Sequence, residues 1–155
     1  MKVLIITYYW PPAGGSGVQR WLKFVKYLQN FDIEPIVYTV DNANYPKEDK
    51  TLLNEVPKNI KILKQPIWEP TDLLFWKKNS KQKKGVSNVS NGGFLSFIRG
   101  NFFIPDPKIF WVNSSVKYLQ KIIDSSEIDV IISTGPPHSM HLIAQKLHQK
   151  NNLKW

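Results

Sequence analysis

A strand, a glycine-rich loop and a helix follow one another at the start of the chain, and this order constrains the fold more than any other feature. Residues 3–6 form a short, continuous apolar run, which is typical of a strand buried on both faces. After the loop, apolar residues recur at helical spacing from Val18 to Leu28, and residues 35–40 form a β-branched run. The pattern predicts a βαβ unit with a right-handed crossover, and therefore a parallel sheet.

The alternation of strands and helices continues along the chain. The further elements expected are a short helix at residues 52–56, a strand at 60–63, a helix at 112–125, a strand at 129–134 and a helix at 140–147. Residues 153–155 look like the opening of another strand, which suggests a truncated chain. We expect residues 1–155 to form one α/β domain, Rossmann-like and three-layered, with a mainly parallel sheet.

Composition excludes several classes of protein. The chain has no cysteine, so it has no disulfide and no thiolate site. No apolar run approaches the roughly 20 residues that span a bilayer, and the run at residues 3–6 is too short for a signal peptide. We therefore expect a cytoplasmic protein without transmembrane helices.

The formal net charge of +9 is distributed unevenly. Residues 77–99 carry six basic side chains and no acidic one, and residues 77–93 have the composition of a flexible basic insertion. This segment is either a solvated loop or a contact with an anionic membrane surface, made by Lys77, Lys78, Lys81, Lys83, Lys84, Arg99, Phe94 and Phe97. Nucleic acid is not expected as a partner, because the aromatic residues are not interleaved with the lysines as stacking platforms.

The loop after the first strand is a candidate phosphate site. It ends in Gly14, Gly15, Ser16 and Gly17, and small residues at the start of a helix let a phosphate approach backbone N–H groups. Arg20, one turn into the helix, offers further donors. The spacing is neither that of a dinucleotide fingerprint nor that of a Walker loop. The alternative is a glycine turn needed only for backbone geometry.

The loop after the strand at residues 129–134 is the second candidate. Its His138 carries an imidazole, the side-chain type commonly used in general acid–base chemistry, and is a candidate base or phosphate donor. In the alternative, His138 or Ser139 only caps the following helix and His141 faces solvent. Both loops leave the carboxyl edge of the predicted parallel sheet, where open α/β sheets bind ligands, so we expect them to meet along one rim.

Metal binding and serine hydrolysis are not supported by the sequence. His138 and His141 are three residues apart on a helix, but no carboxylate lies near them in the sequence and no Asp-x-Asp pair occurs. A Gly-x-Ser-x-Gly elbow is also absent. We assign no metal.

Three segments together resemble a known family. Residues 8–20 read YYWPPAGGSGVQR, and this stretch resembles the opening of bacterial glycosyltransferase family 4 proteins. Residues 105–111, PDPKIFW, and residues 133–139, STGPPHS, are similar to later markers of the same group. The resemblance implies a GT-B enzyme with two Rossmann-like domains, which transfers a sugar with retention of configuration and without a metal.

The resemblance also implies roles for individual residues. The loop at residues 14–17 would border the donor diphosphate, and His138 would lie near the transferred sugar. The remaining residues of the cleft would be Tyr9, Trp10, Thr134, Gly135 and Ser139. The N-terminal domain would mostly bind the acceptor.

The substrates and the setting of the reaction follow from the same resemblance. A sugar nucleotide would be a co-substrate, no cofactor would be needed, and the acceptor would be a polysaccharide or a lipid-linked glycan. The enzyme would work in the cytoplasm or peripherally at the inner face of the cytoplasmic membrane. The second domain, with its paired glutamates, is absent from these residues, so the chain alone is not expected to catalyse transfer. The alternative is a non-catalytic Rossmann-like binding or interaction module.

Overall fold

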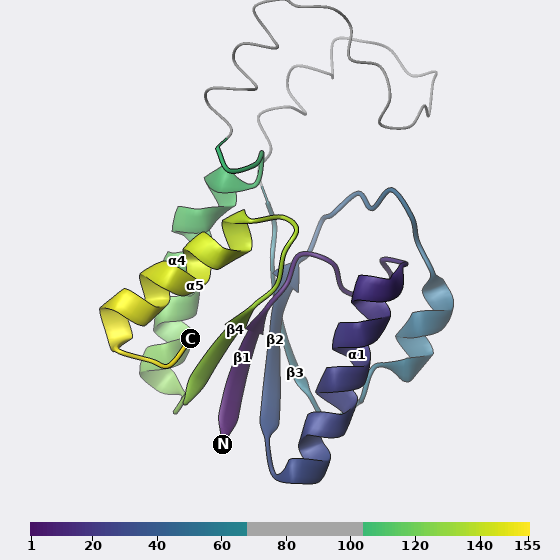
Figure 1. Ribbon diagram of the computed structural model, residues 1–155, viewed down its shortest axis with the longest axis horizontal. Coiled ribbons are helices and arrows are strands. Elements are labelled where there is room, and N and C mark those ends of the chain that lie inside the picture. The colour runs from purple at the N-terminus through teal and green to yellow at the C-terminus, as the bar shows by residue number, and fades with distance from the viewer. Residues whose placement is uncertain (68–103) are drawn as a thin grey trace, which may run out of the picture.

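The fold is built on one sheet of four parallel strands. The computed structural model describes residues 1–67 and 104–155 (Figure 1). The strands are β1 (Lys2–Ile6), β2 (Glu34–Val40), β3 (Lys61–Gln65) and β4 (Val130–Ser133), in the spatial order β3-β2-β1-β4. Every pairing in this sheet is parallel, which confirms the predicted α/β class.

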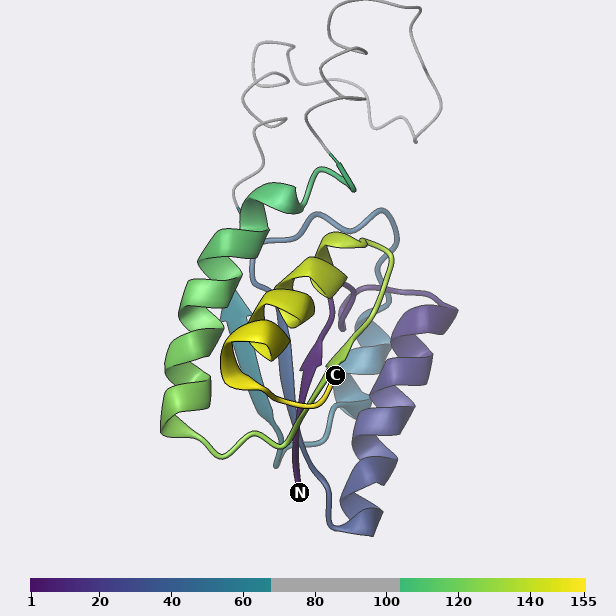
Figure 2. The ribbon, with the colours of Figure 1, turned by 60° about the vertical axis from the view of Figure 1, so that its left-hand side comes forward.

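Helices cover both faces of the sheet and give the molecule three layers (Figures 1 and 2). One face carries α1 (Ser16–Leu28), which continues as the short 3-10 helix η1 (Gln29–Phe31). Beside α1 lies a second 3-10 helix, η2 (Lys50–Glu55). The opposite face carries α4 (Ile109–Ser125) and α5 (Ser139–Asn151). This arrangement is the Rossmann-like, three-layer domain expected from the sequence.

The core follows the alternation of side chains along the central strand β1. Leu4 and Ile6 point to the layer of α4 and α5, whereas Val3 and Ile5 point to the layer of α1. All four side chains are at most 3% exposed. Burying each of them contributes about 1.5 to 3 kcal/mol, so the unbroken apolar run at residues 3–6 places this strand in the middle of the sheet.

The predicted elements agree with the observed ones, with boundaries that shift by a few residues. The helix expected at residues 112–125 begins three residues earlier, and the short helix expected at 52–56 is the 3-10 helix η2. The basic insertion expected at residues 77–93 lies outside the described residues, as do all eight side chains assigned to membrane contact.

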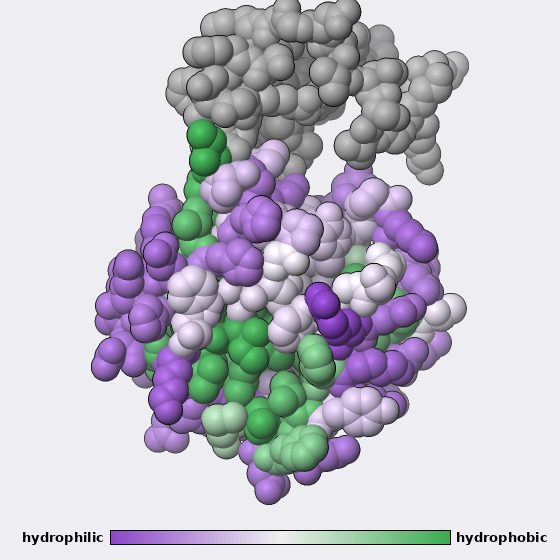
Figure 3. Space-filling view, in the orientation of Figure 1, coloured by the Kyte–Doolittle hydropathy of each residue, from purple (hydrophilic) through white to green (hydrophobic). Residues whose placement is uncertain are grey.

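Residues 153–155 run beside β4 only briefly. Lys154 forms a single parallel bridge with Val130, and Ile131 donates its backbone N–H to the carbonyl of Lys154 at 2.8 Å. In Figure 3, apolar side chains gather between α5 and α1, where the edge of β4 reaches the surface. Val130 and Ile132 on this strand are only partly buried, in keeping with its place at the edge of the described sheet.

Candidate functional site

The order of the strands defines a switch point between β1 and β4. From β1 the chain passes outward to β2 and β3, and it then returns to β4 on the other side of β1. Loops that diverge from two adjacent strands in this way leave a crevice at the carboxyl edge, where open α/β sheets bind ligands. The glycine-rich loop follows β1 and the proline–histidine loop follows β4, so both loops begin at this switch point.

The two loops touch at their first residues. Thr7 and Thr134 follow directly on β1 and β4, and their hydroxyl oxygens are 3.3 Å apart. The backbone N–H of Thr7 donates to the carbonyl of Tyr38, and that of Thr134 donates to the carbonyl of Ile6, each at 3.0 Å. These bonds extend the strand pairing by one residue on both sides, so the loops leave from one rim, as the sequence predicted.

The glycine-rich loop ends at an open helix terminus. Gly15 is the N-cap of α1 and has φ +125° and ψ 165°, a conformation that is essentially restricted to glycine. Within the described residues no side chain caps α1, and its first turn has no acidic residue. The amide groups of this turn and the positive end of the helix dipole are therefore available to an anion.

The three glycines of the loop differ in what surrounds them. A Cβ added at Gly14 would lie 3.2 Å from Cβ of Asp49, whereas one added at Gly17 would meet nothing within 4 Å. Gly14 therefore packs against the neighbouring loop, while Gly17 faces open space at the helix terminus. Arg20 is exposed on the outer surface of α1.

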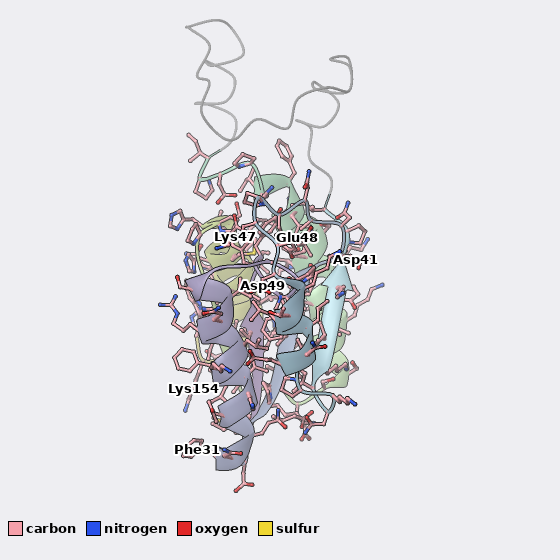
Figure 4. All side chains as sticks on the ribbon, turned by 90° about the vertical axis from the view of Figure 1, so that its right-hand side faces the viewer. Phe31, Asp41, Lys47, Glu48, Asp49 and Lys154 are labelled. Carbon is pink, nitrogen blue, oxygen red and sulfur yellow. The ribbon has the colours of Figure 1, made fainter. Side chains whose placement is uncertain are left out.

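The residues that precede η2 form backbone hydrogen bonds with the glycine loop. Gly14 donates its N–H to the carbonyl of Lys47 at 2.9 Å, and Asp49 donates its N–H to the carbonyl of Pro12 at 2.7 Å. Figure 4 shows Lys47, Glu48 and Asp49 together at this end of α1 and η2. The carboxylate of Asp49 accepts two hydrogen bonds from Thr51 and caps η2, so it is not a free charge beside the glycines.

The imidazole that packs on the end of a strand is His141, in the first turn of α5. Its Nδ1 lies 2.9 Å from Oγ of Ser133, the last residue of β4, and Nε1 of Trp155 donates to the same oxygen at 2.9 Å. On the other side of the ring, a Cβ added at Gly135 would lie only 2.8 Å from Nε2. Gly135 is therefore required for the close approach of this ring to the loop.

The candidate chosen from the sequence, His138, lies farther from the strand. Its side chain is exposed, it occupies the N-cap position of α5 without a side-chain capping bond, and its ring centroid is 5.9 Å from that of His141. The alternative in which His141 faces solvent is wrong, because this ring is partly buried and bonded to Ser133. The sequence signal for His141 was its position one helical turn after His138, hence on the same face of the helix.

The N-terminus of α5 is already occupied by a carboxylate. Asp106 accepts hydrogen bonds from the backbone N–H and the hydroxyl of Ser139, both at 2.8 Å. The Pro-Asp-Pro segment before α4 is thus tied to α5, and a negative charge sits at the positive end of that helix. An anionic ligand at this rim would meet the uncapped terminus of α1 rather than that of α5.

Two residues expected to line the cleft are buried. Trp10 is 2% exposed and packs in the core beside α1, while Ser139 is fully buried on Asp106, so neither contacts an open cleft in this structure. Thr134 and Gly135 do lie on the rim. Tyr9 lies there too, partly buried among aromatic rings, with centroid distances of 5.0 Å to Tyr8 and 5.9 Å to Tyr45.

A groove lies on the other layer of the molecule, between α4 and α5. It has a volume of about 630 Å³, runs between the middle of α4 and the C-terminal half of α5, and its lining includes Lys117, Lys121, Lys146 and Lys150. None of its lining residues belongs to either of the two loops. Within residues 1–67 and 104–155, no group of three or more His, Asp or Glu side chains is placed to hold a metal ion, and no helix is both long and apolar enough to cross a membrane.

Comparison with known proteins does not assign this chain to a family. We found no family model, no curated protein and no solved structure that matches the chain.

Proposed function

We propose that this chain is the N-terminal, acceptor-side domain of a retaining, metal-independent glycosyltransferase of the GT-B type. The enzyme would move a sugar from a sugar nucleotide to a polysaccharide or a lipid-linked acceptor. One observation carries the proposal: the two loops that resemble family 4 motifs meet at the switch point of a parallel sheet, where Thr7 and Thr134 are in contact. A chance resemblance between short sequence segments would not require the two loops to lie next to each other in the fold.

The glycine loop would stabilise the departing diphosphate. Its backbone N–H groups belong to a helix terminus without a side-chain cap, and the helix dipole there favours negative charge. Donors that are already in place cost no reorganisation when charge develops on the leaving group. The open space at Gly17 supports this role, because a phosphate needs close access to the backbone.

His141 would take the role that the resemblance gives to His138. It is held between Ser133 and Gly135 on the rim, so its orientation is fixed by its partners, whereas His138 is exposed. Near the transferred sugar, Nε2 would hydrogen-bond a hydroxyl group of that sugar. His138, about 6 Å away between ring centroids, would lie farther out toward the acceptor.

The second wall of the cleft would come from another domain. The leaving diphosphate needs hydrogen-bond donors on both sides, so the residues described here would supply only part of its stabilisation. In this proposal backbone and side-chain donors take the place of a metal ion. The acceptor would approach along the rim that contains Tyr9 and Thr134. A lipid-linked acceptor would place the enzyme at the inner face of the cytoplasmic membrane, where the basic residues at 77–99 would add a contact.

The test uses the protein encoded by the complete reading frame that contains these residues. It is incubated with a panel of sugar nucleotides and with membranes carrying lipid-linked acceptors, and the products are analysed for linkage and anomeric configuration. We expect one donor to be consumed, with retention of configuration. Gly17→Val should lower kcat/KM roughly 100-fold, because a branched side chain at this position would keep the diphosphate away from the backbone N–H groups that donate to it.

The matched control is Gly17→Ala, which adds the smallest side chain at the same position. It should retain most of the activity, and both variants should remain folded because a Cβ at this site meets nothing within 4 Å. If no sugar nucleotide is consumed and no product forms, the chain belongs to the alternative class, a non-catalytic Rossmann-like binding module.

A further inference from the structure

The outer face of α1 and η1 carries three exposed aromatic side chains in a row. Phe24 is 50% exposed, Tyr27 is 52% exposed and Phe31 is 74% exposed. Phe31 lies at the C-terminal end of η1 (Figure 4). We call these three residues the α1 stripe. Large aromatic groups are rarely left in water without a partner when they form a contiguous surface.

The spacing of the α1 stripe places it opposite the core. Residues 24, 27 and 31 are three and four positions apart, so they share one face of the helix. The buried side chains of α1 are Val18, Leu22 and Val25, which lie on the other side against the sheet. The helix therefore carries apolar side chains on two faces, and only the face toward the sheet is buried in the fold.

Positive charge flanks the α1 stripe. Arg20, Lys23 and Lys26 lie on the exposed part of the helix, and no acidic residue occurs from Ser16 to Phe31. Lys23 forms an ion pair with Glu55 of η2, while the ammonium group of Lys26 lies 6.0 Å from the ring centroid of Tyr27. Because Glu55 neutralises Lys23, the positive charge beside the α1 stripe comes from Arg20 and Lys26, while the exposed Asp32 follows Phe31 at the end of the stripe.

We propose that the outer face of α1 docks on an anionic lipid surface, with the α1 stripe in the headgroup zone and the basic side chains on lipid phosphates. A helix with aromatic residues on its exposed face and Lys or Arg beside them is typical of helices that lie in the plane of a membrane interface.

An acidic protein or a second copy fits less well. A second copy would bring Arg20, Lys23 and Lys26 against their own counterparts, since a twofold interface pairs a surface with itself. The bilayer also explains why the aromatic residues line up along the helix axis, because a plane contacts one stripe along the whole length of a helix. This contact is separate from the one expected at residues 77–99 and does not depend on the proposed enzymatic function.

The experiment measures flotation of the 155-residue chain with two kinds of vesicles, pure phosphatidylcholine and an equal mixture of phosphatidylcholine and phosphatidylglycerol. We expect binding to the anionic vesicles only. Lys23→Gln with Lys26→Gln should weaken it roughly 30-fold, because each basic residue near an anionic surface contributes a factor of about five. Phe24→Ser with Phe31→Ser should also weaken it.

Matched controls alter the same kinds of residues on the opposite layer. Lys117→Gln with Lys121→Gln removes two charges from α4, and Ile104→Ser with Phe110→Ser removes two side chains that are 66% and 45% exposed. Both controls should bind as the unchanged chain does. Because the chain has no cysteine, Tyr27→Cys and Lys117→Cys can each carry an environment-sensitive fluorophore, and only the probe at position 27 should report an apolar environment on binding.

Three results would overturn the assignment. The first is that the unchanged chain fails to bind anionic vesicles. The second is that the α1 variants and the controls lose binding equally. The third is that the α1 variants abolish self-association in ultracentrifugation while vesicle binding is unaffected. The last result would make the α1 stripe an interface between copies of the chain.

Discussion

Nδ1 of His141 lies 2.9 Å from Oγ of Ser133, and this contact joins the first turn of α5 to the last residue of β4. Since Oγ also accepts a hydrogen bond from Nε1 of Trp155, the hydroxyl hydrogen of Ser133 is free to be donated to Nδ1. In that arrangement the neutral imidazole carries its proton on Nε2, which faces the loop at Gly135. Two side chains outside the loops thus set the orientation of the imidazole on the rim.

Replacing Gly135 should displace this ring. In Gly135→Ala the new Cβ would lie 2.8 Å from Nε2 of His141, so the imidazole has to move and the bond to Ser133 is lost. The imidazole ¹⁵N signals of His141 should shift, and we expect a similar shift in Ser133→Ala, which removes the same hydrogen-bond partner. Unchanged His141 signals in Gly135→Ala would contradict the close approach.

The two glycines at the start of α1 should respond in opposite directions to alanine. Gly15→Ala should lower the free energy of unfolding by about 1 to 3 kcal/mol, because an L-residue is strained at the backbone angles of Gly15. Gly17→Ala lies in the first helical turn with open space around it and should raise stability by about 0.5 to 1 kcal/mol. Urea unfolding of both variants checks this, and equal effects would refute the conformation at Gly15.

Removal of the cap on α5 should destabilise the fold and loosen the second loop. Asp106→Ala deletes the acceptor for the N–H and hydroxyl of Ser139, which should cost about 1 to 2 kcal/mol. Asp106→Asn keeps a capping oxygen, so its free energy of unfolding should fall by less than that of Asp106→Ala. Hydrogen exchange at the amide of Ser139 should accelerate most in the alanine variant; equal exchange in both would mean that the cap contributes little.

Trp111 should tolerate phenylalanine but not alanine. Its ring stacks on Tyr38 with centroids 5.1 Å apart, yet its buried Nε1 has no hydrogen-bond partner in the described part of the chain. Trp111→Phe keeps an aromatic ring and removes the unsatisfied donor, so the free energy of unfolding should change by less than about 1.5 kcal/mol. Trp111→Ala should cost about 3 to 5 kcal/mol. Thermal unfolding compares the two, and similar losses would contradict the stacking role.

Stability should decline in alkaline solution. Burial raises the pKa of Tyr45 to about 12 and also raises that of Tyr38. Because these phenols stay neutral in the folded protein above pH 10 while they ionise in the unfolded chain, the unfolded state releases more protons. The free energy of unfolding should therefore be flat below about pH 10 and fall as the pH rises toward 12, less steeply in Tyr45→Phe. A flat profile across this range would contradict the burial of both hydroxyl groups.

The elements of the fold could be predicted because their signals are local. The apolar run at residues 3–6 and the helical spacing from Val18 to Leu28 each lie within one element, and the strand–helix order then fixes a parallel sheet. This order also predicted that both loops leave the carboxyl edge of one sheet, and the adjacency of β1 and β4 in the observed strand order then brings them into contact.

The details of the rim could not be predicted, because they depend on contacts between distant residues. Asp106 caps a helix that begins 33 residues later, and this contact buries Ser139, which we had expected in the cleft. Trp10 is adjacent to a loop in sequence, yet its side chain turns back into the core beside α1. His141 reaches Ser133 only because Gly135 leaves room for the ring.

The most direct test of a shared site on the rim is an NMR titration of the 155-residue chain with uridine diphosphate, guanosine diphosphate and inorganic pyrophosphate. Our account predicts that backbone signals of Ser16 and Gly17 shift together with the imidazole signals of His141, because both loops flank one diphosphate site. Shifts confined to the lysine-lined groove between α4 and α5, or to one loop alone, would contradict it.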